Sequence, residues 1–161
     1  MIAEPTAPSV PHGAGLGPRY VLIPVHGYGI AVATVARMLD VEGNGVARVL
    51  APNEAIPYGA QPVLLAETTV YGAVCVERLL QAWGSAVHRP PKPWLVLVSD
   101  APARPAAPAR YRFRALHERV VGVARIPYLP SLRTVEDAEA ALEHKDVQIA
   151  AAKLRRQLEG K

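Results

Sequence analysis

Two glycines that follow an apolar segment are the residues whose types and spacing most directly suggest chemistry in this sequence. Residues 20–25 form an almost unbroken apolar run, Gly27 and Gly29 come after it, and residues 31–39 then place apolar side chains at helical spacing. A buried strand that turns tightly into a helix aims the free N–H groups of that helix at the turn, where they can bind a phosphate. The segment therefore predicts a nucleotide site. Its candidate contacts are His26, Gly27, Tyr28, Gly29 and Thr34.

The residues that hydrolyse a nucleotide are missing from the same segment. A P-loop needs a lysine for the phosphate charge, followed by a Ser or Thr hydroxyl for magnesium. With Thr34 at the hydroxyl position, Ala33 stands where the lysine is needed and Val32 where the second glycine is needed; shifting the register by one puts Val32 at the lysine. The first 91 residues contain no lysine at all. We therefore expect no ATP hydrolysis by the usual route, and we assign no catalytic residue.

A dinucleotide site is the alternative use of the same glycines. Gly27-x-Gly29 after a strand matches the start of the Rossmann fingerprint, although Val32 stands where a third small residue is usual. The segment Gly27 to Ala33 also resembles the G-Y-G-M-A-V-A segment in the NADP-binding domain of proton-translocating transhydrogenases. An acidic residue should close the second strand to bind the ribose, but the nearest acid, Glu54, comes four residues late, after Leu50. The cofactor thus stays open between none and a nucleotide, and the glycines could also serve only the turn.

Composition sets the class of protein. The 161 residues are 50% hydrophobic and 20% charged, which is typical of one globular domain with a sizeable core. The net charge of +4 comes without a run of five basic residues, so nucleic acid is only weakly suggested as a partner. The single cysteine, Cys75, excludes an internal disulfide and fits a reducing compartment. No apolar run reaches membrane-spanning length, so we expect a cytoplasmic protein.

Apolar runs alternate with segments of helical spacing along the chain. The expected strands are residues 20–25, 46–50, 62–67, 94–100 and 120–126. The expected helices are residues 31–39, a helix capped by Thr68 or Thr69 and ending at Gly84, residues 111–119, and a long helix over residues 134–158 that a capping box at Thr134 begins. Alternation of this kind predicts an α/β fold, a three-layer sandwich around a mainly parallel five-stranded sheet. Residues 1–18 are expected to be a flexible N-terminal segment, residues 19–133 the α/β domain and residues 134–161 the C-terminal helix.

Several polar residues outside the glycine segment are further candidates. Asp100 ends an expected strand and could face the carboxyl edge of the sheet, or it could only begin the turn before Pro102. Four arginines interleaved with Tyr111 and Phe113 could contact nucleic acid or an acidic partner, or form an ordinary solvated helix face; they are Arg110, Arg112, Arg114 and Arg119. The histidines and Cys75 lack metal-ligand spacing, so we predict no metal site, and Cys75 is expected to be a buried small side chain.

The apolar face of the C-terminal helix is the last open question. Its members are Val147, Ala151, Leu154 and Leu158. They could pack on the domain itself or on a second subunit, so a homodimer is possible.

The downstream half of the chain resembles ParA/MinD-like P-loop ATPases. The resemblance lies in residues 63–69 with the helix that follows, in residues 94–100, and in residues 120–133, where a last strand runs into a Pro-Tyr segment. In that family the last segment lies beside the bound base, which implies a base contact at Ile126, Pro127 and Tyr128.

Residues 20–133 also resemble a family of short actinobacterial proteins of uncharacterised function. Its members share a P-loop-like HGGAG-TT start and a later LVLVADAPGR strand and loop, which His26-Gly27 and residues 95–104 match in part. Members tend to be encoded on plasmids and integrated conjugative elements. The resemblance implies a degenerate Walker A loop in an accessory or interaction protein with an unknown protein partner, and it suggests that a mobile element encodes the protein.

Overall fold

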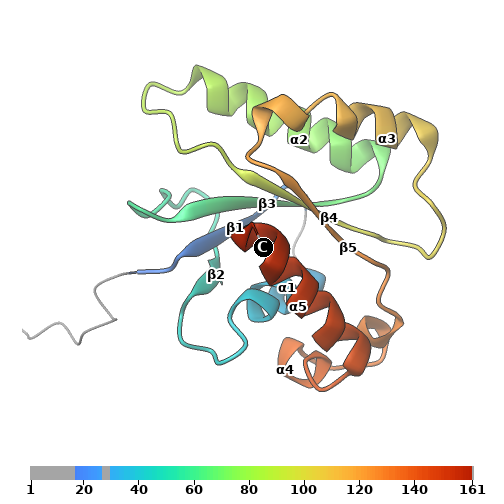
Figure 1. Cartoon of the computed structure of the whole chain (residues 1–161). Helices are drawn as coiled ribbons and strands as arrows, with labels where there is room; N and C mark the ends of the chain where they lie inside the picture. The colour runs from blue at the N-terminus through green and yellow to red at the C-terminus, as the bar shows by residue number, and fades with distance from the viewer. Residues whose placement is uncertain (1–16, 27–29, 161) are drawn as a thin grey trace, which may run out of the picture.

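The structure, a computed structural model, describes residues 17–26 and 30–160. Within these ranges five strands form one sheet, in which every neighbouring pair is parallel and the order is β2-β1-β3-β4-β5 (Figure 1). The strands are β1 (Tyr20–Pro24), β2 (Ala47–Val49), β3 (Gln61–Glu67), β4 (Trp94–Val98) and β5 (Val123–Ile126). Each lies within the predicted range or begins one residue before it, so the strand pattern read from the sequence is confirmed. Residues 1–16, most of the expected N-terminal segment, lie outside the described residues, as do Gly27, Tyr28 and Gly29.

Helices cover both faces of this sheet, which confirms the predicted three-layer α/β sandwich (Figure 1). One face carries α1 (Ile30–Leu39), α4 (Ala138–Ala141) and α5 (Lys145–Glu159), and the other carries α2 (Val70–Ser85) and α3 (Ala107–Arg114). A large hydrophobic core therefore lies on each face of the sheet. Side chains of β3 alternate between them: Val63 and Leu65 pack towards α1 and α5, whereas Leu64 and Ala66 pack towards α2 and α3.

The strand order reverses direction next to β1. From β1 the chain passes through α1 to β2 on one side, and from β2 it returns to β3 on the other side of β1. The order 2-1-3-4-5 is that of flavodoxin-like doubly wound sheets, whose ligands bind where the winding reverses. The return segment, residues 50–60, contains no helix, and its Leu50, Ile56 and Ala60 cover Val21 of β1. The crevice between β1 and β3 is therefore the place in this fold where a ligand is expected.

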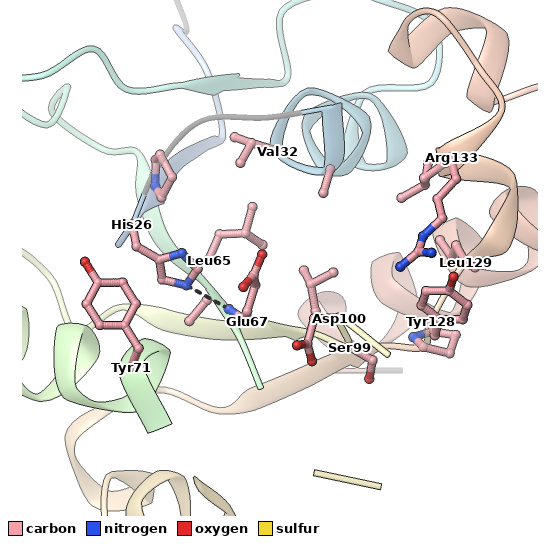
Figure 2. Close-up of a pocket in the computed structure, with 16 residues that line it drawn as sticks. His26, Val32, Leu65, Glu67, Tyr71, Ser99, Asp100, Tyr128, Leu129 and Arg133 are labelled. Atoms are coloured by element: carbon pink, nitrogen blue, oxygen red, sulfur yellow. Dashed lines mark hydrogen bonds between the residues drawn. The ribbon is translucent and has the colours of Figure 1, made fainter. Parts of the chain in front are cut away.

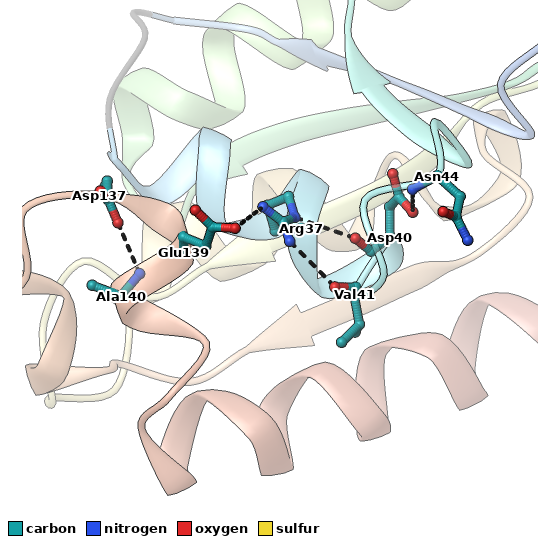
Figure 3. A network of polar contacts seen from close by, with 7 residues as sticks. All are labelled: Arg37, Asp40, Val41, Asn44, Asp137, Glu139 and Ala140. Carbon is teal, nitrogen blue, oxygen red and sulfur yellow. Dashed lines mark hydrogen bonds and ion pairs between the residues drawn. The ribbon is translucent and has the colours of Figure 1, made fainter.

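The C-terminus of α1 is held by a buried carboxylate. Asp40 accepts a hydrogen bond from the backbone N–H group of Asn44 at 2.9 Å (Figure 3). It also accepts one from the Gly45 N–H at 2.8 Å, and the two bonds close the loop before β2. Arg37 donates to the carbonyl oxygens of Asp40 and Val41, and its guanidinium lies 3.7 Å from the Glu139 carboxylate of α4. This network gives hydrogen-bond partners to carbonyl groups at the C-terminal end of α1, and it joins that end to α4 in the C-terminal part of the chain.

The C-terminal region differs from the single long helix predicted over residues 134–158. A short 3₁₀ helix (Pro130–Arg133) precedes α4 and α5, which are separate helices. The Thr134 hydroxyl donates to the Ser131 carbonyl at 3.0 Å and so closes the preceding turn instead of capping a helix. The side chain that caps is Asp137, which accepts from the Ala140 N–H at 2.8 Å.

The apolar face of α5 packs on the chain's own domain. Its residues Val147, Ala151, Leu154 and Leu158 are buried in the core beside α1. Arg155 reaches across from α5 and donates to the Met38 carbonyl at 2.7 Å, near the C-terminal end of α1. The side chains that the sequence left open between domain and second subunit are thus covered within the chain.

Two helices on the opposite face also depart from their predicted form. The short helix predicted over residues 111–119 is wrong in its bounds: α3 begins at Ala107, with Pro108 in its first turn, and a 3₁₀ helix (His117–Arg119) follows it. The start of α2 is confirmed, because Thr69 accepts from the Gly72 N–H at 2.9 Å. The helix ends at Ser85, one residue beyond the predicted Gly84, and its buried residues are Gly72, Ala73, Val76 and Leu80. None of the described helices is long and apolar enough to cross a membrane.

A prediction for stability follows from the close approach of α2 to the end of β3. A Cβ at Gly72 would lie 2.3 Å from the Glu67 carbonyl oxygen, whereas a Cβ at Gly84 of the same helix meets nothing within 4 Å. We expect Gly72→Ala to lower the free energy of unfolding by about 1 to 3 kcal/mol, because backbone must move. The matched Gly84→Ala should raise it by up to about 1 kcal/mol through helix propensity. Urea denaturation measures both, and equal effects of the two variants would contradict the contact.

Candidate functional site

A cavity of about 530 Å³ opens at the carboxyl edge of the sheet, at the point where the winding reverses. It lies between the first turn of α1, the ends of β1, β3 and β4, and the segment that follows β5 (Figure 2). Apolar side chains line much of it, among them Val32 of α1, Leu65 of β3, Val98 of β4 and Leu129. The polar side chains that line it are His26, Glu67, Tyr71, Ser99, Asp100, Tyr128 and Arg133. An apolar cavity with a few convergent polar groups is the usual form of a small-molecule site.

The structure gathers four of the candidate residues at this cavity. His26, Asp100, Pro127 and Tyr128 come from three separate parts of the sequence and all line it. Thr34 does not line it. The Thr34 side chain is fully buried, and its hydroxyl has no hydrogen-bond partner among the residues that the structure describes.

His26 extends the pairing of β1 with β3 by means of its side chain. Val25 N–H donates to the Leu65 carbonyl at 3.0 Å, and the next N–H of β3 on that side, from Glu67, donates to His26 Nε2 at 3.1 Å. A ring nitrogen that accepts carries no proton, so the neutral ring holds its proton on Nδ1. His26 can therefore donate from Nδ1 to a ligand. Its ring packs at 5.7 Å from the Tyr71 ring, which fixes the orientation (Figure 2).

Two carboxylates lie at the ends of neighbouring strands and line the same cavity. Glu67 ends β3, and Asp100 follows β4, so parallel pairing brings both to the same edge. The buried Thr68 donates from its hydroxyl to Asp100 Oδ1 at 3.3 Å, while its N–H donates to the Val98 carbonyl at 3.2 Å. Asp100 is thus held at the cavity rather than serving only the turn before Pro102. Among the described residues no group of three or more His, Cys, Asp or Glu side chains is placed to hold a metal ion.

A positive charge faces the carboxylates from the opposite side of the cavity. Arg133, at the end of its 3₁₀ helix, places its guanidinium over the Tyr128 ring at 5.4 Å from the centroid (Figure 2). This contact orients the guanidinium and gives the cavity one flat wall. Besides His26, the charged groups in the described lining are two carboxylates and one guanidinium.

Glu67 and Arg133 are site residues that the sequence analysis did not single out. A signal existed for each: Glu67 ends an apolar run expected to be a buried strand, and Arg133 lies within the segment that resembles ParA/MinD-like ATPases. Neither could be assigned from the sequence alone, because charged residues at strand ends are common and their convergence depends on strand order.

Cys75 is half-buried on α2, so it is less deeply buried than the sequence suggested. A hydrogen bond with its thiol raises the pKa of Tyr71, which lines the cavity. Cys75 therefore bears on the cavity only through this neighbour.

The four candidate arginines near residues 110–119 do not present one surface with the aromatic residues between them. Phe113 is buried in the core, and Arg112 lies 3.0 Å from the Glu77 carboxylate of α2. Arg114 stacks over the Tyr111 ring at 6.0 Å. Because two residues of a helix correspond to about 200° of rotation, Arg112 leaves α3 on a different side from Arg110 and Arg114. Arg119 lies beyond α3, in the following 3₁₀ helix.

No family model, curated protein or solved structure matches this chain. What is established is therefore the fold alone, a parallel five-stranded α/β sheet flanked by helices.

Glu54, which comes four residues late for a ribose contact, is not among the residues that line this cavity and pairs with Arg48 of β2. Its carboxylate accepts from both terminal nitrogens of Arg48 and, at 2.9 Å, from the Ala51 N–H. The hydrogen bond from Arg48, followed by that from the Ala51 backbone, lowers the pKa of Glu54 to about 2. The loop after β2 is held by this pair.

This pair predicts a dependence of stability on pH. Since folding lowers the pKa of Glu54 from 4.5 to about 2, its contribution to stability is present above 4.5 and is lost as the pH falls towards 2. We expect Glu54→Gln to be less stable than the wild type at neutral pH, with the difference shrinking through that window. Urea midpoints measured against pH test this. Glu136→Gln, which removes an exposed carboxylate outside the pair, is the control. If Glu54→Gln were as much less stable than the wild type at pH 2 as at neutral pH, the pairing would be contradicted.

Proposed function

We propose that this chain binds a nucleotide or dinucleotide at the carboxyl edge of its sheet without hydrolysing it. The observation that carries the proposal is the 530 Å³ cavity at the winding reversal between β1 and β3. Open α/β sheets bind their ligands in this crevice, and the volume lies within the range of small-molecule sites.

The polar groups of the cavity suggest how such a ligand would lie. The N–H groups of the first turn of α1 and His26 Nδ1 are the donors for a phosphate. Glu67 and Asp100 are acceptors for ribose hydroxyls, the role that an acidic residue has in dinucleotide sites. Tyr128, with Arg133 on its ring, supplies the flat wall for a base, on the side where the resemblance to ParA/MinD-like ATPases expects it.

The charges of the cavity favour some nucleotides over others. Two carboxylates against one guanidinium repel the dense negative charge of a triphosphate. A dinucleotide such as NAD spreads less charge over a larger ligand and offers ribose hydroxyls to the same carboxylates. We therefore place NAD before ATP, GTP and NADP as the expected ligand.

The absence of a P-loop lysine supports binding without hydrolysis. No lysine precedes Lys92, and the described lining contains none. Together with the resemblance to the actinobacterial family, this supports an accessory or interaction protein related to ParA/MinD-like ATPases and encoded on a mobile element. That the chain binds another protein, or a second copy of itself, stays a prediction.

Ligand-dependent thermal stabilisation tests the binding. We expect NAD to raise the melting temperature more than ATP, GTP or NADP, and a ligand at a hundred times its Kd adds about 2.7 kcal/mol to the unfolding free energy. Melts unchanged by all four ligands would remove the proposal.

Two variants and a control locate the ligand in that experiment. Arg133→Gln should abolish most of the shift, whereas Arg125→Gln, which removes an exposed arginine of β5 outside the cavity, should not. Asp100→Asn should reduce the shift with NAD and increase that with ATP, because it removes a hydroxyl acceptor and a repulsive charge together. The same change with both ligands would contradict the assigned role of Asp100.

For ATP we expect no turnover. Phosphate release from ATP should equal the background without protein. Release above background that is lost in Asp100→Asn, while Arg125→Gln retains it, would show a hydrolytic site and overturn the non-hydrolysing assignment.

A further inference from the structure

A second cavity, of about 290 Å³, lies at the opposite edge of the sheet. Three cations line it: Arg89 and Lys92 from the connector between α2 and β4, and Arg119 from the 3₁₀ helix before β5. The rest of its wall includes the apolar Leu80, Trp83 and Pro93. Pro93 precedes β4 and Ser99 of the first cavity follows it, so about 20 Å separate the two sites at roughly 3.3 Å per residue. This cavity is separate from the proposed nucleotide site.

Within the part of the chain that the structure describes, the three cations form no ion pair. Over residues 17–26 and 30–160 the ion pairs involve Arg19, Arg37, Arg48 and Arg112, and none involves Arg89, Lys92 or Arg119. The described residues that line the cavity include no Asp or Glu. Like charges around one concave space repel one another and concentrate a positive potential there, which an anion relieves.

Hydrogen bonds from three separate parts of the chain hold the backbone beneath these cations. Trp83 Nε1 of α2 donates to the Pro91 carbonyl at 3.2 Å, Gln61 Nε2 of β3 donates to the Lys92 carbonyl at 2.9 Å, and the Val121 N–H donates to the Pro93 carbonyl at 2.8 Å. Prolines at positions 90, 91 and 93 restrict the backbone further. A site held in this way loses little entropy when a ligand binds.

The charge of the surrounding segment has the same sign. Residues 70–122, which include α2 and α3, contain eight Lys or Arg and three Asp or Glu. The remaining described residues contain nine Lys or Arg and ten Asp or Glu. The positive charge of the chain is therefore concentrated on the part that forms this cavity. The long-range field therefore attracts anions towards it.

We propose that this basic cavity binds the phosphate group of a phosphate monoester, with the organic part of the ester against Trp83 and Leu80. A phosphate presents three acceptor oxygens, which matches cations arriving from three backbone positions, whereas a carboxylate presents two. The two guanidinium groups provide paired donors suited to phosphate. The apolar wall provides area for an aromatic or aliphatic substituent.

A titration with small anions at constant ionic strength tests the proposal. The probes are phenyl phosphate, inorganic phosphate and benzoate, and the readout is the NMR signal of the Trp83 indole N–H. We expect phenyl phosphate to bind more tightly than inorganic phosphate, because its ring packs on Trp83, and more tightly than benzoate. The absence of a saturable shift with phenyl phosphate would overturn the proposal, as would tighter binding of benzoate.

Matched variants separate a built site from a diffuse positive field. Arg89→Gln and Arg119→Gln should each weaken phenyl phosphate about tenfold or more. Arg104→Gln removes the same charge from the same basic segment but outside the cavity, and it should leave the affinity nearly unchanged. Equal weakening by all three would overturn the site. Arg133→Gln should also have no effect, so failure at the nucleotide site and failure here are distinguishable.

Oligonucleotides distinguish a terminal monoester from backbone phosphates. One 5′-phosphorylated strand and the same strand without that phosphate are titrated under the same conditions. The proposal expects the 5′-phosphorylated strand to bind more tightly and Arg89→Gln to remove the difference. Equal affinities would overturn the assignment to a phosphate monoester.

Discussion

The parallel pairing of β1 with β3 is the constraint on which the rest of the structure depends. It aligns Tyr20–Pro24 with residues 61–65 and continues through the Val25 N–H and the His26 side chain. Since β2 lies on the other side of β1, this pairing creates the reversal in winding and with it the crevice at the carboxyl edge. Glu67 would lose the partner of its N–H where β1 turns away, and His26 supplies that partner. A residue that borders the glycine segment thus holds the end of the central ladder while it faces the cavity.

The two cavities have opposite electrostatic characters. At the carboxyl edge Glu67 and Asp100 outnumber Arg133 in the lining, whereas at the amino edge the described lining contains Arg89, Lys92 and Arg119 and no carboxylate. All strands are parallel, so every connection between consecutive strands crosses from one edge to the other, and each edge collects residues from several connections. The fold can therefore keep two chemically distinct cavities apart on one small sheet.

Much of the fold could be read from the sequence because apolar runs buried on both faces leave a clear signal. Thr69 could also be predicted, because a helix cap is recognised from the residues directly around it. Asp100 and the Pro127-Tyr128 pair could be predicted because they follow parallel strands, whose ends meet at one edge of the sheet. The long C-terminal helix failed for an equally physical reason. Thr134 and Asp137 both have side chains that can cap, and only the tertiary contacts of Ser131 and Asp146 settle which one begins a helix.

The sequence by itself determined the five strands of this protein, its layer type and the lack of a P-loop lysine, because these follow from local composition and spacing. Only the tertiary structure decided the strand order, the cover for α5, and the convergence of His26, Glu67, Asp100 and Arg133 on one cavity. It also separated the arginines of α3 and left Arg119 beside Arg89 and Lys92. Strand order and side-chain convergence arise from contacts between residues far apart in the chain, and a single sequence carries no local signal for such pairs.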